Sequence, residues 1–298
     1  MLELTTSTAP PCGPRRHVRV HRLRTALLPA VFLPAVLGAA GPLQIVKPII
    51  SQMDGGAPDP PGYEHAAGET LYFTCRVSGY TKSPEEKIHV AYSVQAFDPK
   101  GVPLSELYKN EATDEVGPQD KDWMPKIQTE LEIPPLAGSG AYKIVVKAED
   151  VLAKTSTELA VPFQLRGHEV APSDALVARN FRFLRAEEDT VPLERPIYKP
   201  GDSVWAKFDL IGFRYGPGNK IDVSYVISVI AASGKVLWTQ PEPAAEQTAS
   251  FYPKRYVPAA VGINLQTTIH PGEYAIGVAA KDAVGNQTYE GKFTFTVE

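Results

Sequence analysis

Apolar side chains occupy every second position in several short runs of this chain. In the run LYFTCRV, Leu71, Phe73, Cys75 and Val77 share one side. A period of two is typical of a β-strand with one buried face, and no segment of sufficient length shows the period of an amphipathic helix. The predicted strands cover residues 71–77, 88–94, 142–146 and 161–165, with later counterparts at 204–210, 221–227, 274–278 and 293–297.

The two sets of strands belong to an internal repeat. Residues 68–104 align with residues 201–237 at a constant offset of 133, and nine of these 37 positions are identical. A second block aligns residues 131–165 with 263–297 at an offset of 132. A unit of this length is too long for a solenoid repeat, so it predicts one complete fold used twice. Strands with a single apolar face predict two sheets packed face to face in each copy.

Further elements complete each copy. Residues 43–50 and 178–184 are expected to form a first strand in each copy. Residues 105–126 and 239–262 lack an alternating pattern and are expected to be irregular surface loops. The sequence therefore predicts an all-β protein with a signal peptide at 1–40, a first immunoglobulin-like sandwich at 41–166, a polar linker at 167–174 and a second sandwich at 175–298.

The N-terminal region has the pattern of a secretory signal. Five arginines, the first at Arg15 and the last at Arg24, precede an apolar run over residues 25–41 that ends in small residues. This order predicts export with cleavage near Ala40. An uncleaved membrane anchor is the alternative, although the run is short for a bilayer span and contains Pro29 and Pro34. The predicted location is the periplasm, the medium or the cell surface, with membrane contact only through this segment if it stays uncleaved.

Composition narrows the function classes. Hydrophobic residues make up 43% of the 298 positions, which is enough for folded cores. The 28 prolines and 23 glycines fit many short strands joined by turns. A formal net charge of −4, with no block of basic residues in the body of the chain, argues against nucleic acid as a partner. Beyond residue 40 the only cysteine is Cys75, so that region cannot form an internal disulfide.

Several segments resemble immunoglobulin-like domains. GETLYFTCRVSGY resembles their B strand, whereas GSGAYKIVVKAED and PGEYAIGVAAKDAVGNQT resemble the F strand and F–G hairpin of bacterial immunoglobulin-like and fibronectin-type modules. IYKPGDSVWAKFDLIGF also resembles macroglobulin-type domains. The resemblance implies a fold and no activity. Ile144 stands where the second cysteine of an antibody-type pair would be, and Tyr142 and Tyr274 are expected to form either tyrosine corners or ordinary core contacts.

Candidate catalytic groups are sparse. Outside the first 40 residues the histidines are His65, His89, His168 and His270, and none stands in a recognised nucleophile motif. Cys75 falls on an inward strand position, where a thiol usually acts as an inert small hydrophobe. The sequence therefore predicts no catalytic residues and no cofactor.

Two repeated aspartates raise the question of a metal. Asp150 and Asp282 end equivalent strands, and the segment DAVGN at 282–286 offers oxygen ligands suited to calcium. A hairpin turn uses the same residue types to cap backbone N–H groups. We favour the turn and expect no metal site, because the first copy has Leu152-Ala153-Lys154 in the same place.

Aromatic residues give the best indication of a binding surface. Tyr72 and Trp205 occupy equivalent outward positions, Trp238 ends a strand, and Trp123 lies in the first irregular stretch. Exposed aromatics anchor protein partners or stack on sugars, although a loop or the neighbouring domain covering Tyr72 and Trp205 is the favoured explanation for that pair.

The predicted function is that of an exported, non-enzymatic interaction or structural module of the cell envelope. Its expected partner is an envelope or extracellular protein that contacts the stretches 105–126 and 239–262. A carbohydrate-binding accessory module that uses the loop aromatics is the alternative. A macroglobulin-like inhibitor fragment has less support, because the chain lacks a thioester cysteine motif, and a hydrolase has the least.

Overall fold

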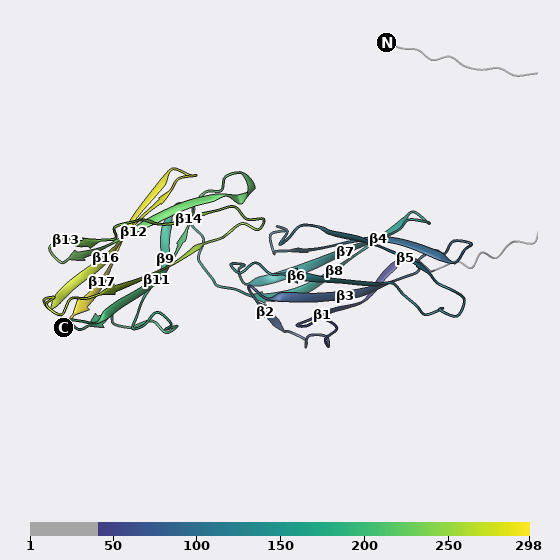
Figure 1. Ribbon diagram of the computed structural model, residues 1–298, viewed down its shortest axis with the longest axis horizontal. Coiled ribbons are helices and arrows are strands. Elements are labelled where there is room, and N and C mark those ends of the chain that lie inside the picture. Colours follow the sequence, from purple (N-terminus) through teal and green to yellow (C-terminus); the bar gives the residue numbers. More distant parts are fainter. Residues whose placement is uncertain (1–40) are drawn as a thin grey trace, which may run out of the picture. The chain divides into compact units, whose positions relative to one another are not determined.

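The computed structural model describes residues 41–298, which fold into mainly antiparallel β-sheets, with one short parallel pair in each of the two larger sheets (Figure 1). The predicted signal peptide at 1–40 lies outside the described residues. In the N-terminal sandwich, a three-stranded sheet in the order β1-β3-β6 accompanies a five-stranded sheet in the order β2-β8-β7-β4-β5. Its strands are β1 (Gln44–Ser51), β2 (Glu64–Ala66), β3 (Thr70–Ser78), β4 (Lys87–Phe97), β5 (Tyr108–Glu115), β6 (Lys126–Glu132), β7 (Gly140–Asp150) and β8 (Thr155–Arg166).

The C-terminal sandwich repeats this arrangement. A sheet in the order β15-β11-β9 accompanies one in the order β10-β17-β16-β12-β13, in which β14 also pairs with β12. Its strands are β9 (Val177–Leu184), β10 (Ile197–Tyr198), β11 (Ser203–Ile211), β12 (Ile221–Ala231), β13 (Val236–Thr239), β14 (Ala244–Thr248), β15 (Val257–Asn264), β16 (Gly272–Asp282) and β17 (Gln287–Val297). The prediction of an all-β sandwich protein is confirmed, whereas the division into domains at 41–166 and 175–298 with a linker at 167–174 stays a prediction. Among the described residues, no helix is long and apolar enough to span a membrane.

The cores follow the alternation read from the sequence. Along β3, Leu71, Phe73, Cys75 and Val77 are fully buried and the residues between them are half-buried. The predicted first strands are observed as β1 and β9, but their burial does not alternate regularly, because each contains a register shift. Each sandwich encloses its own cluster of buried apolar side chains. One outside residue, Tyr252, belongs to the cluster of the N-terminal sandwich although it lies between β14 and β15.

The repeat extends to backbone conformation. Gly79 and Gly212, identical in the alignment, have φ angles of 75° and 77°. A Cβ atom on Gly79 would lie 2.2 Å from the carbonyl oxygen of Pro42, and one on Gly212 would lie 2.0 Å from that of Ala175. Only glycine fits where the chain entering the first strand approaches so closely with a positive φ. The identity of these glycines therefore reflects a shared backbone contact.

Two repeated aspartates fix equivalent turns. The buried Asp150 accepts hydrogen bonds from two N–H groups of its own turn and one, at 2.6 Å, from the N–H of Thr81. Asp282 accepts the same set, with the N–H of Arg214 at 2.9 Å. The turn-capping role favoured from the sequence is confirmed, and each carboxylate also ties its hairpin to the connection that follows β3 or β11.

The repeated tyrosines form tyrosine corners. The hydroxyl of Tyr142 donates to the carbonyl oxygen of Gly138 at 2.8 Å, and that of Tyr274 donates to the carbonyl oxygen of His270 at 2.8 Å. Each bond reaches four residues upstream at the start of a central strand, as in immunoglobulin-type sandwiches. Of the two roles left open by the sequence, the corner is therefore the one observed.

The prediction of irregular loops at 105–126 and 239–262 was wrong in part. The first stretch contains β5, and the second contains β14 and most of β15. All residues of β5 except one are exposed, and the strand is held by backbone pairing to β4 at the edge of its sheet. Such an edge strand buries no side-chain face, so it carries no alternating apolar pattern.

Candidate functional site

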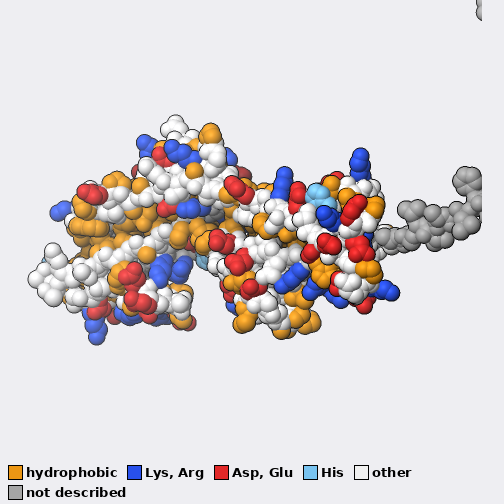
Figure 2. All heavy atoms as spheres, turned by 45° about the vertical axis from the view of Figure 1, so that its right-hand side comes forward, with side chains coloured by type: hydrophobic (Ala, Val, Ile, Leu, Met, Phe, Trp, Pro, Cys, Tyr) orange, Lys and Arg blue, Asp and Glu red, His pale blue; other side chains and the backbone are white. Residues whose placement is uncertain are grey.

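The C-terminal sandwich has an open groove of about 500 Å³ between strands β13 and β15. Both strands are sheet edges. We call this the β13 groove; it is lined by Val229, by Leu237 and Trp238 on β13, by residues 262–266, and by Ile269. No charged side chain lines it, and five of its nine lining residues are Val, Leu or Ile. Figure 2 shows hydrophobic side chains gathered in a band over the C-terminal sandwich, in the left half of the view.

A β-bulge shapes one wall of this groove. Ile230 of β12 pairs with Val236 and Val229 pairs with Trp238, so Leu237 is an extra residue without a partner. Neighbouring residues of a regular strand point to opposite faces, but a bulge re-aims them. Leu237 and Trp238 consequently line the groove together. Val236, Leu237 and Trp238 are 53%, 48% and 44% exposed, which is unusual for three successive apolar residues on a free sheet edge.

The polar groups in the groove are neutral. Asn264 accepts a hydrogen bond from the hydroxyl of Ser203 at 2.7 Å, which leaves the amide N–H groups of Asn264 available. Gln266 adds a second side-chain amide. The chemistry of the groove therefore suits an uncharged, largely apolar ligand that also presents hydrogen-bonding groups.

The structure brings together two of the four aromatic residues singled out from the sequence. Trp238 lines the groove, and the ring of Trp205 lies over Gly262, another lining residue, within 2.6 Å of where a Cβ would be. Trp205 is half-buried as a result. Tyr72 is half-buried on β3 and Trp123 lies between β5 and β6, so neither belongs to this site.

Trp123 instead stands in a braced loop of the N-terminal sandwich. We call residues 116–125, between β5 and β6, the β5–β6 loop. The phenol of Tyr80 donates to the carbonyl oxygen of Trp123 at 2.7 Å, and the two rings meet nearly at right angles with centroids 6.4 Å apart. Burial raises the pKa of Tyr80, helped by the nearby Asp120, so this phenol is a donor at neutral pH. Trp123 remains 36% exposed.

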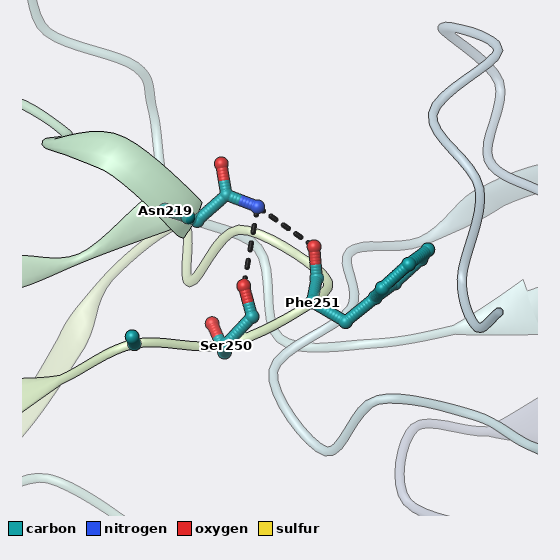
Figure 3. Close-up of a pocket in the computed structure, with 5 residues that line it drawn as sticks. Asn219, Ser250 and Phe251 are labelled. Carbon is teal, nitrogen blue, oxygen red and sulfur yellow. Dashed lines mark hydrogen bonds between the residues drawn. The ribbon is translucent and has the colours of Figure 1, made fainter.

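The equivalent loop of the C-terminal sandwich, residues 249–256 between β14 and β15, is braced in the same way. We call it the β14–β15 loop. The phenol of Tyr215 donates to the carbonyl oxygen of Lys254 at 2.6 Å. The side-chain amide of Asn219 donates to the carbonyl oxygens of Ser250 and Phe251 at 3.1 and 2.7 Å, and the Phe251 ring projects away from it (Figure 3). The shallow hollow drawn there thus has its polar groups occupied in holding the loop.

This second loop reaches the N-terminal sandwich. Asp98 is buried and accepts two backbone N–H bonds from its own turn through Oδ1. Its Oδ2 accepts from the phenol of Tyr252 at 3.1 Å and from the guanidinium of Arg255 at 2.7 Å. Burial raises the pKa of Tyr252 far above its ordinary value, so the phenol remains a donor. Sequence reasoning missed this cluster, because nothing in a turn of the form DPKG points to a partner 154 residues away.

The predicted linker is bonded at its start to both sandwiches. The N–H of Gly167 donates to the hydroxyl of Ser139 at 3.1 Å, and that hydroxyl donates back to the carbonyl oxygen of Gly167 at 3.0 Å. The next residue, His168, places Nε2 2.7 Å from the carboxylate of Asp209 on β11. Adjacent residues are therefore fixed to different sandwiches.

His65 is the buried histidine of the N-terminal sandwich. It lies on β2, with Nε2 3.1 Å from a carboxylate oxygen of Asp59, and it packs edge-on against Phe163 at 6.0 Å. The repeat places Tyr198 at the same point, edge-on against Phe295 at 5.9 Å. His65 thus takes the place of a core aromatic residue. Among the described residues, no group of three or more His, Cys, Asp or Glu side chains is arranged to hold a metal ion.

Comparison with known proteins adds little to this description. No protein-family model and no curated protein sequence matches the chain. Among solved structures, the chain is similar to the C-terminal domain of the Streptococcus pyogenes antigen I/II-family protein AspA. The identity is 11% and the TM-score 0.30, over 85% of this chain and 99% of that chain. At that TM-score the likeness carries no weight, so the fold assignment rests on the strands, their pairing and their cores.

Proposed function

We propose that this protein is an exported, non-enzymatic module of the cell envelope that acts by binding another protein through the β13 groove. The groove combines an uncharged apolar lining with a free strand edge whose backbone groups are open to pairing. Proteins commonly recognise extended partner segments at such edges, with backbone hydrogen bonds supplying affinity and side-chain pockets supplying specificity.

The observation that supports this proposal is the run of three exposed apolar residues on β13. Soluble proteins usually protect a free sheet edge with charge, proline or a covering segment, because an apolar edge pairs with other chains. In β13, Val236, Leu237 and Trp238 are all exposed beside a groove. A contiguous exposed apolar surface supports the assignment of this edge as an interaction site.

Affinity capture from the envelope fraction of the source cell tests the proposal. The wild-type protein, Leu237→Asp and Trp238→Ala serve as baits, with Val191→Asp as a matched change at an exposed apolar residue outside the groove. We expect a specific co-purifying protein with wild type and Val191→Asp, and its loss with both groove variants. Equal recovery with all four baits would place the contact elsewhere.

Export is tested separately. The basic and apolar pattern at residues 1–40 supports a signal peptide. Fractionation of cells, followed by N-terminal sequencing of the exported protein, is expected to give a chain that begins near residue 41. A chain that keeps its first 40 residues in the membrane fraction would instead support an anchor.

Carbohydrate binding is the second candidate, supported by Trp238 beside the side-chain amides of Asn264 and Gln266. An aromatic ring stacks on the apolar face of a sugar while amides bond its hydroxyls, and a neutral lining suits a neutral polysaccharide. Retention on immobilised neutral polysaccharides, lost in Trp238→Ala and kept in Trp123→Ala, would support it. A glycan array without signal would remove it.

A further inference from the structure

The repeat allows the β13 groove to be compared with the same place in the N-terminal sandwich. There Leu104 stands at the position of Leu237, and Ile133 at that of Leu265. Leu104 is 5% exposed, whereas Leu237 is 48% exposed. The two copies share a fold and a buried framework, yet one is closed at this end and the other is open.

An aromatic residue from outside the N-terminal sandwich joins its buried cluster and bonds to the turn that follows β4. Tyr252, on the β14–β15 loop, belongs to the same buried cluster as Leu104 and Ile133, and it is itself 6% exposed. Its hydroxyl and the guanidinium of Arg255 both bond to Asp98, whose turn follows β4 at this end. The chain thus already contains one example of a loop of one sandwich contacting the turn after β4 of the other.

The β5–β6 loop is the counterpart of that docking loop. Each loop joins the edge strand paired to β4 or β12 to the strand paired to β3 or β11. A tyrosine phenol braces each one, Tyr80 in the first case and Tyr215 in the second. The β5–β6 loop therefore presents Trp123 on a preorganised backbone, with its side chain 36% exposed.

We propose that the β13 groove receives the β5–β6 loop of a second copy of this protein, so that the contact made inside the chain is repeated between chains. This inference rests on the proposed function and names its partner. Trp123 of one copy would fill the space beside Leu237 and Trp238 of the next, by analogy with Tyr252, which joins the buried cluster of the N-terminal sandwich within the chain. Burying large aromatic residues in such a pocket is typical of the centre of a specific interface.

The charges around the two surfaces agree with this pairing. The internal contact joins Arg255 of the loop to Asp98 of the receiving turn. The β5–β6 loop instead carries Asp120 and Asp122 around one base, Lys121, and is net acidic, whereas the turn before β13 carries the exposed Lys235. Relative to the internal contact, the charges of loop and receiving turn are exchanged, but they are still opposite to each other. Opposite charges favour a correctly oriented encounter between the loop and the groove.

Such a contact is head to tail, because a copy uses different surfaces to contact its two neighbours. Contacts of this type extend into rings or open chains, in contrast to a symmetric dimer that uses one surface twice. A variant defective in the groove keeps an intact loop, and a variant defective in the loop keeps an intact groove. Mixing the two variants therefore distinguishes this proposal from a symmetric pairing of β13 with β13.

Sedimentation velocity of the purified protein over a concentration series tests the proposal. Wild type is expected to self-associate, and Leu237→Asp and Trp123→Ala each to weaken association by about 30-fold or more, as loss of a central anchor does. An equimolar mixture of the two variants should form a 1:1 complex that grows no further. Val191→Asp should behave as wild type, and circular dichroism should show that every variant is folded.

Three results would overturn the inference. Wild type that stays monomeric up to about 100 µM would reject it, because that limit excludes all but very weak association. Trp123→Ala that associates as wild type does would point to a symmetric or unrelated contact, as would a variant mixture that stays monomeric. If the protein does not self-associate but a different envelope protein is still captured through the groove, the proposed function holds and only the inference of self-association fails. If neither self-association nor capture through the groove is seen, the proposed function and this inference both fail.

Discussion

Tyr252 donates a hydrogen bond to Asp98 from a position 154 residues later in the chain, and the two residues belong to different sandwiches. Tyr252→Phe removes this donor and leaves the buried carboxylate with one side-chain partner, Arg255. We expect the free energy of unfolding to fall by about 1.5–3 kcal/mol, the range for a hydrogen bond to a charged group. Urea denaturation followed by fluorescence measures it. Tyr289→Phe is the control, since no hydrogen bond of its hydroxyl is found among the described residues, and an equal loss there would contradict the assignment.

His65 should make stability depend on pH. Burial holds the pKa of His65 below its ordinary 6.5, against the opposing effect of the carboxylates of Asp59 and Glu69. Between the lowered pKa and 6.5 the unfolded chain binds more protons, so the free energy of unfolding falls as pH drops through this window. Unfolding measured from pH 8 to 5 checks this.

The matched variant for this effect is His65→Tyr, which copies the residue found at Tyr198 in the second sandwich. It should remove the slope near pH 6, and His89→Gln, a second histidine substitution at a half-buried position on β4, is the control for loss of a histidine elsewhere. A slope that is the same in His65→Tyr as in wild type would show that another group carries the pH dependence.

Asp282 should contribute more to stability than an ordinary surface acid. Asp282→Ala leaves the N–H of Arg214 and two turn N–H groups without their acceptor at a fully buried site. We expect a loss of about 3 kcal/mol or more, with Asp222→Ala, at a half-buried position, costing far less. Thermal unfolding gives the comparison. A chelator should leave the melting temperature unchanged, and a fall on chelation would indicate a calcium ion at this turn.

Cys75 should be chemically silent in the folded protein. Burial raises the pKa of its thiol to about 12, so the reactive thiolate is scarce at neutral pH and the sulfur is also out of reach. Peptide mapping after treatment with a thiol reagent at pH 8 should find Cys75 modified only after addition of denaturant. Rapid labelling of the native protein would mean that β3 opens readily.

The strands that could be predicted from the sequence are those whose side chains alternate between buried and exposed positions. Strand β3 and its counterpart β11 were found because every second residue is buried, and the turn role of Asp150 follows from residue type and position. Strand β5 was missed because backbone pairing alone holds it, and backbone pairing leaves no residue pattern.

The sequence predicted individual residues of the candidate site but not the groove that they form. Trp238 and Trp205 were singled out, but the bulge at Leu237 that turns this edge into a groove depends on strand register, which composition does not reveal. The contact of Tyr252 with Asp98 depends on how distant segments come together in three dimensions. Long-range polar pairs of this kind have no local signature in the chain.

The bonds made by Gly167 and His168 bear on how the molecule would respond to load. Because the first is tied to Ser139 and the second to Asp209, no free length of chain separates the two anchoring points. A force applied to one sandwich is therefore expected to reach the other without first extending a flexible linker. The two sandwiches would separate only after these bonds break. A tandem built in this way is expected to respond to load as one stiff unit, not as two units on a loose tether.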